Sequence, residues 1–117
     1  MSKRCLLTIA RQELTRAAHA PQGRSERVLV GEEGRSRLSI LALRPDVSAV
    51  QLDQPWTVQV LAGRIRVQHG SVVSVGYPGD LIVGPAGGSL WSGGDCVVLL
   101  SLEHRAAPGT EMAMSAS

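Results

Sequence analysis

Closely spaced glycines and prolines divide the chain into short segments between residues 24 and 102. Within many of these segments apolar residues alternate with polar ones, which is the period of a β-strand with one buried face. The segments follow one another at intervals of roughly 8–12 residues. This pattern predicts an all-β barrel or sandwich rather than alternating β and α units.

Nine segments are predicted to be strands, and the first two form a hairpin around the glycine-rich turn at residues 31–34. Residues 92–95, Ser-Gly-Gly-Asp, have the composition of another hairpin turn. The predicted strands are residues 24–30, 36–43, 47–52, 56–61, 64–69, 72–75, 81–83, 89–91 and 96–102.

The first part of the chain has a different period. Apolar residues recur at helical spacing between residues 6 and 20, and Pro-Gln-Gly at 21–23 ends the pattern. Thr8 is the predicted N-cap of this helix. Glu13 and Arg16 lie three residues apart, so we expect them to form a weak surface pair.

The composition is that of one globular domain: 117 residues, 44% hydrophobic and 19% charged. Cys5 and Cys96 do not form a disulfide framework, and two reduced thiols indicate a cytoplasmic protein. We expect no signal peptide and no membrane-spanning segment. The predicted organisation is a helical segment at 1–23, a β-barrel at 24–105 and a disordered tail at 106–117.

The net charge of +2 is unevenly distributed. Residues 1–50 carry nine Lys and Arg against five Asp and Glu, whereas residues 51–117 carry three against five. The arginines of the basic half are interleaved with acids and have no aromatic neighbours for base stacking. We therefore expect a solvated surface or a protein-partner face, and neither nucleic acid nor a membrane as a partner.

Residues 79–91, GDLIVGPAGGSLW, resemble the second conserved motif of the cupin family in the spacing of Gly79, Pro85 and Gly87. Residues 58–67 are similar to the end of the first cupin motif, where a strand enters a glycine turn, and Pro-Gly-Asp at 78–80 matches a frequent cupin turn. The resemblance covers residues 36–103. It implies a jelly-roll barrel, a double-stranded β-helix, here preceded by one helix and a hairpin.

The metal ligands of that family are missing. Counted back from Gly63, the glutamate position falls on Trp56, and Leu90 stands where the last histidine would be. The histidine pair falls on Ala49 and Gln51, or on Val50 and Leu52. Because a metal site needs at least three N, O or S ligands, we expect a metal-free protein with no cofactor. The other candidate ligands, which do not form a recognisable cluster, are His19, His69, Cys96, Glu103 and His104.

The resemblance also implies which side chains face the barrel interior. We expect them either to fill the interior or to line an apolar pocket for a small molecule. Tyr77, Glu103 and His104 could act as acids or bases only if they converge, so no catalytic residue is assigned. The expected lining residues are Gln51, Trp56, Val58, Val60, Ile65, Val67, Tyr77 and Leu90.

Three functions agree with these features. The first is non-catalytic binding of a small apolar or amphipathic molecule inside the barrel. The second is a cofactor-independent cyclase or isomerase that shapes its substrate in an apolar cavity. The third is a dimeric regulatory or structural partner protein, since the resemblance implies a homodimer.

Overall fold

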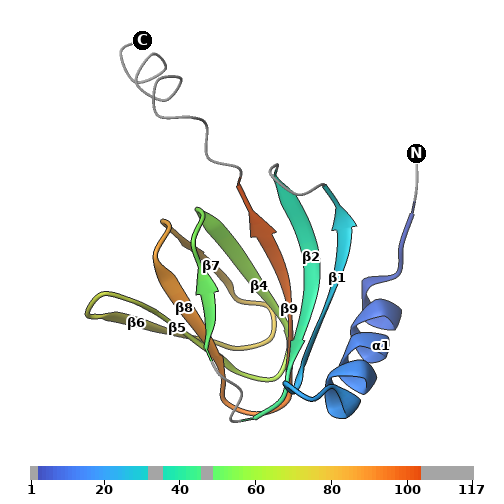
Figure 1. Cartoon of the computed structure of the whole chain (residues 1–117). Helices are drawn as coiled ribbons and strands as arrows, with labels where there is room; N and C mark the ends of the chain where they lie inside the picture. Colours follow the sequence, from blue (N-terminus) through green and yellow to red (C-terminus); the bar gives the residue numbers. More distant parts are fainter. Residues whose placement is uncertain (1–2, 32–35, 46–48, 104–117) are drawn as a thin grey trace.

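The computed structural model describes residues 3–31, 36–45 and 49–103. One helix precedes nine strands in this part of the chain (Figure 1). The predicted strands are all found, with bounds that shift by a few residues. The elements are α1 (Leu6–His19), β1 (Arg24–Val30), β2 (Arg37–Leu43), β3 (Val50–Leu52), β4 (Trp56–Ala62), β5 (Ile65–His69), β6 (Val72–Gly76), β7 (Leu81–Gly84), β8 (Gly88–Ser92) and β9 (Cys96–Leu102).

The strands form two antiparallel sheets that face each other. One sheet has the order β1-β2-β9-β4-β7 and the other has the order β3-β8-β5-β6. Only β1–β2 and β5–β6 are consecutive strands that pair; every other connection between strands crosses from one sheet to the other. This crossing connectivity is that of a jelly roll.

The turn at residues 92–95 is therefore not a hairpin, contrary to the sequence prediction, because β8 and β9 lie in different sheets. It lies against the crossing from β4 to β5. At Gly63 in that crossing φ is +79°, and a Cβ would lie 2.2 Å from the carbonyl oxygen of Asp95. Only glycine fits there, so the two crossings can meet at one end of the barrel.

The space between the sheets is filled by an inner core. Alternate residues of β4 point into it, as expected for Trp56, Val58 and Val60. The inner core consists of Leu41, Leu43, Leu52, Trp56, Val58, Val60, Ile65, Val67, Leu90, Cys96, Val98, Leu100 and Leu102.

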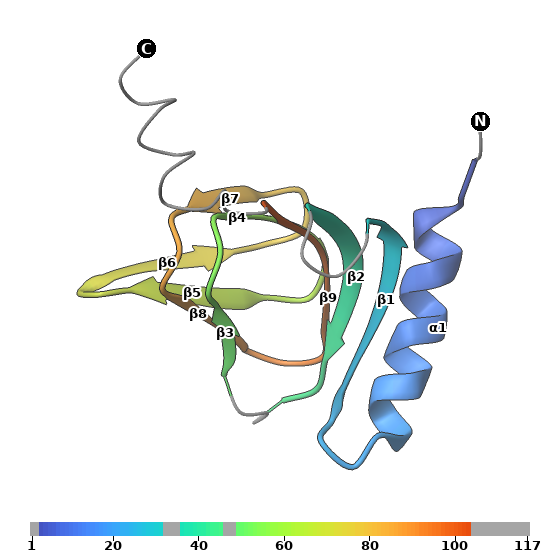
Figure 2. The same cartoon turned by 45° about the horizontal axis from the view of Figure 1, so that its top comes forward.

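A second, outer core lies between α1 and the back of the five-stranded sheet, where Figure 2 shows the helix alongside β1 and β2. Its buried members are Ile9, Ala10, Ala17, Ile40, Ala42 and Val97. Because β2 and β9 contribute to both cores, they are apolar on both faces. Within the described residues, α1 is too short and too polar to cross a membrane.

One prediction about the helix is wrong, and a second holds only in part, because the expected pair of Glu13 and Arg16 forms at 3.6 Å although Glu13 is buried. Cys5, not Thr8, is the N-cap, and its side chain makes no capping hydrogen bond. Glu13 is not on the surface but completely buried, because the helical period places it on the face that contacts β1. There it accepts a hydrogen bond from the hydroxyl of Ser25, at 2.6 Å. The predicted tail at 106–117 lies outside the described residues.

Candidate functional site

Six of the expected lining residues lie in the inner core and pack against one another. Leu90, at the position of the last cupin histidine, is completely buried between its sheet neighbours Val50 and Val67. Gln51 and Tyr77 are instead exposed. The six core residues are Trp56, Val58, Val60, Ile65, Val67 and Leu90.

Trp56, at the position where the resemblance places a glutamate, is buried in the inner core. Its indole ring lies against the backbone of β7 and β8, where a Cβ added to Gly84 would come within 2.3 Å of the ring. Only 4% of Trp56 is exposed, and its Nε1 has no hydrogen-bond partner among the described residues. The ring therefore acts as a plug that closes this end of the inner core.

These residues do not fit a metal ion. The positions of the family's ligands hold Trp56, Leu90 and either of two pairs with no imidazole or carboxylate. The amide oxygen of Gln51 accepts a hydrogen bond from the Ser89 hydroxyl at 3.0 Å. Across residues 3–31, 36–45 and 49–103, no three His, Cys, Asp or Glu side chains are grouped so that they could hold a metal.

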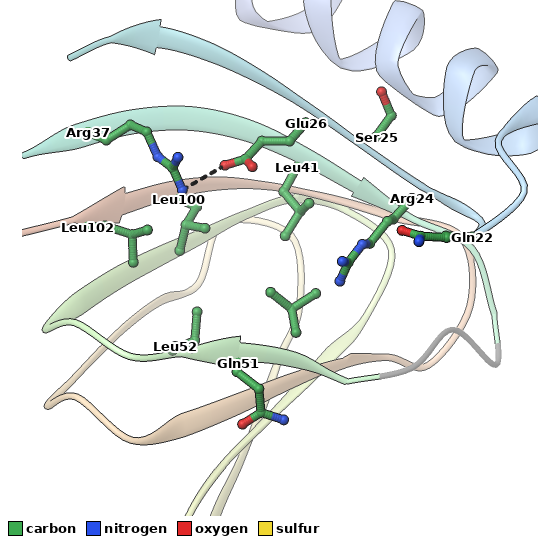
Figure 3. A pocket seen from close by; sticks show the side chains of 11 residues that line it. Gln22, Arg24, Ser25, Glu26, Arg37, Leu41, Gln51, Leu52, Leu100 and Leu102 are labelled. Carbon is green, nitrogen blue, oxygen red and sulfur yellow. Dashed lines mark ion pairs between the residues drawn. The ribbon is translucent and has the colours of Figure 1, made fainter. Parts of the chain in front are cut away.

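An open cavity of about 280 Å³ lies at one side of the barrel, between β1, β2 and β9 on one wall and β3 on the other. We call it the leucine cavity, because Leu41, Leu52, Leu100 and Leu102 form its floor (Figure 3). Gln51 is the only one of the eight expected lining residues that borders it. Its remaining lining residues are Gln22, Arg24, Ser25, Glu26, Arg37 and Val50.

The rim of the leucine cavity is charged. Glu26 accepts a hydrogen bond from the Ser39 hydroxyl at 2.6 Å, and its carboxylate lies 3.5 Å from Nη2 of Arg37. Arg24 projects from the same face of β1 as Glu26, two residues earlier. The cavity thus combines an apolar floor with a polar entrance, although Figure 3 shows Gln51 on the side of β3 away from Leu52.

Tyr77 and three of the six core residues border two other hollows. Ile65 and the exposed Tyr77 border an outer cleft of about 330 Å³ on the four-stranded sheet, where the guanidinium of Arg66 lies 5.2 Å from the Trp91 ring centroid. Trp56 and Val67 border a third hollow of about 260 Å³ near His69. The predicted lining residues are therefore spread over the core and three separate hollows.

Comparison with known proteins identifies the fold. Neither a protein-family model nor a curated protein sequence matches the chain. Among solved structures, TT1209 from Thermus thermophilus is 20% identical with a TM-score of 0.66, over 91% of this chain and 100% of its own.

Two similar structures are described as cupins. A cupin superfamily protein from Desulfitobacterium hafniense is 15% identical with a TM-score of 0.61, over 70% of this chain and 78% of its own. The cupin domain of Cnp3 from Schizosaccharomyces pombe is 13% identical with a TM-score of 0.63, over 81% of this chain and 72% of its own. The chain has the cupin fold, which confirms the fold predicted from the turns at 78–87.

Proposed function

We propose that this protein binds a small amphipathic molecule in the leucine cavity. The observation that carries the proposal is the pairing of a leucine floor with a charged and amide-bearing rim in one hollow. Ligand sites are mostly apolar with a few polar groups that orient the ligand, and they measure roughly 300–1,000 Å³. A cavity of about 280 Å³ suits a ligand at the small end of that range.

The proposed site differs from the fully interior site expected from the sequence. Val58, Val60 and Leu90 are completely or almost completely buried in the inner core, so their role would be to hold the walls apart. The ligand would lie at the open side of the barrel, next to β3. It needs no metal there, because its affinity would come from apolar contact and a few polar contacts.

The test uses 1-octanol as the probe and a variant that fills the cavity. Val50 is only partly buried and lines the cavity, so the larger ring of Val50→Trp would extend into the cavity while every residue of the inner core is unchanged. We expect saturable octanol binding that shifts the NMR methyl signals of Leu41 and Leu52, and at least a ten-fold weaker affinity in Val50→Trp.

The matched control is Val73→Trp, on the exposed face of β6 and away from the cavity. It should bind octanol as the native protein does. Methyl shifts confined to other leucines, or equal affinity in Val50→Trp and native protein, would show that the cavity is not the site.

A second candidate function is self-association as a homodimer, and the free edge of β1 favours it. Val28 and Val30 are 43% and 64% exposed on this strand, and among the described strands it pairs with β2 alone. An apolar edge strand is a template for pairing with another chain. Sedimentation velocity should show a dimer that Val30→Lys dissociates; a native protein that sediments as a monomer at high concentration would rule this out.

A further inference from the structure

The charges around the leucine cavity do not cancel. Its lining residues include two arginines, Arg24 and Arg37, and one carboxylate, Glu26. The Ser39 hydroxyl and Arg37 both engage Glu26. Its negative charge is therefore already matched by Arg37. Among the residues that the structure describes, one positive charge, that of Arg24, remains unmatched at the entrance.

Arg24 has an acidic neighbour, Glu26, with which it forms no ion pair; Glu26 pairs with Arg37. Glu26 is two residues away on the same strand face, roughly 6.7 Å along the strand. Even so, the guanidinium of Arg24 forms no ion pair or hydrogen bond with any residue in the described part of the chain. Figure 3 shows the Arg24 side chain extending toward β3, while the Glu26 carboxylate turns toward Arg37.

We propose that the ligand of the leucine cavity is a small monocarboxylate with an apolar chain, and that Arg24 determines this specificity. A guanidinium presents two parallel N–H donors that match the two oxygens of a carboxylate. The apolar chain would lie on Leu41, Leu52 and Leu100, which border the same hollow. This inference rests on the proposed function and adds the chemical class of its ligand.

The net charge of the lining also argues against other head groups. A cationic amine would meet the unpaired Arg24 at the entrance, and like charges repel. A neutral alcohol would gain the apolar contacts but not the charge-assisted hydrogen bonds, which are roughly twice as strong as neutral ones. A phosphate dianion would carry one charge more than the lining can match.

The experiment compares three probes of equal chain length, octanoate, 1-octanol and octylamine, with the full-length protein at pH 7.5 and low salt. We expect octanoate to bind at least ten-fold more tightly than 1-octanol, and octylamine to bind most weakly. In Arg24→Gln, the octanoate affinity should fall to the octanol value while octanol binding is unchanged. Arg24→Lys should keep part of the preference for octanoate, because the positive charge remains but the two parallel N–H donors of the guanidinium are lost.

The matched control is Arg11→Gln, which removes an exposed arginine on α1, across the five-stranded sheet from the cavity. It should leave the preference for octanoate unchanged. Equal affinities for octanoate and octanol, or an Arg24→Gln variant that keeps the preference, would overturn this inference but leave binding in the cavity intact. Failure of all three probes to bind would instead overturn the proposed function.

Discussion

At the scale of single residues, Glu13 is a completely buried carboxylate at the contact between α1 and β1. It accepts a hydrogen bond from Ser25, and its Oε2 lies 3.6 Å from Nε of Arg27 and 3.6 Å from Nη1 of Arg16. Arg16 is mostly exposed, so its pairing contributes little. The partly buried contacts to Ser25 and Arg27 therefore fix the position of the helix on the sheet.

We predict that Glu13→Ala lowers the free energy of unfolding by about 2 kcal/mol, because the Ser25 hydroxyl loses its acceptor and Arg27 keeps only its hydrogen bond to Gln12. Glu13→Gln should cost about half as much, since an acceptor for Ser25 remains. Urea denaturation monitored by circular dichroism measures both. The control Glu103→Ala, at an exposed carboxylate, should change stability by less than about 0.5 kcal/mol; an equal loss there would contradict the explanation.

The packing of Trp56 against β7 gives a second prediction. An added Cβ at Gly84 would lie 2.3 Å from the buried indole ring, so Gly84→Ala should destabilise the protein by about 1–3 kcal/mol. Gly94→Ala is the control, because nothing lies within 4 Å of its Cβ position. In a Trp56→Leu background, Gly84→Ala should cause almost no further loss of stability. A loss that persists in this background would show that it comes from the backbone at Gly84 and not from a clash with the indole ring.

The thiol of Cys96 predicts how stability depends on pH. Burial raises its pKa from the ordinary value of 9.0 to about 12. In the unfolded chain the thiol ionises near pH 9, whereas in the folded protein it stays protonated. Stability should therefore fall as the pH rises above about 9, by at most about 1.4 kcal/mol per pH unit from this group.

The comparison is with Cys96→Ala between pH 8 and 10, measured by urea denaturation. The exposed Cys5 is present in both proteins, so its contribution cancels. The native protein should lose stability more steeply than the variant. Parallel curves would show that Cys96 ionises equally in the folded and unfolded states.

At the scale of elements, alternation within many segments, together with the glycine and proline turns that bound them, was enough to predict where strands lie. β4 is an example, since its inward Trp56, Val58 and Val60 alternate with more polar residues. The partners of a strand were less predictable. A glycine-rich turn such as 92–95 joins two strands equally well within one sheet or between sheets, and only the packing of the whole barrel decides.

The candidate site shows a similar limit. Resemblance to cupins predicted that Trp56 and Leu90 replace metal ligands, and both are buried in the core. The leucine cavity was not predicted, because its walls combine β1, β2 and β3 with β9, which is distant from them in sequence. The one local signal was the pair Arg24 and Glu26, two charged side chains on one face of a strand with no turn between them.

The helix gives the prediction at this scale. α1 covers Ile40, Ala42 and Val97 on the back of the sheet, and all three are completely buried. A chain that starts at Gln22 would expose them, so it should bind the dye ANS and aggregate in sedimentation. Arg11→Gln, on the exposed face of α1, should do neither. A shortened chain that stays monomeric and does not bind ANS would show that the sheet is stable without α1.

At the scale of the whole molecule, the two cores are not independent. β2 contributes Leu41 and Leu43 to the inner core, and Ile40 and Ala42 to the outer core. β9 likewise places Val97 in the outer core between Cys96 and Val98 of the inner one. Loss of either core would uncover one face of β2 and β9. The other core, which is built on the same two strands, would then lose stability as well.

Unfolding should therefore be a single cooperative transition. Circular dichroism at 222 nm follows mainly α1, which depends on the outer core, and tryptophan fluorescence follows Trp56, which is in the inner core. We predict coincident urea transitions by the two probes in a Trp91→Phe variant, which leaves Trp56 as the reporter. Ile9→Ala in the outer core should shift both transitions equally, because the lost packing lowers the stability of the whole unit. A helix signal that melts before the fluorescence changes would show instead that α1 is a separate unit on a barrel stable without it.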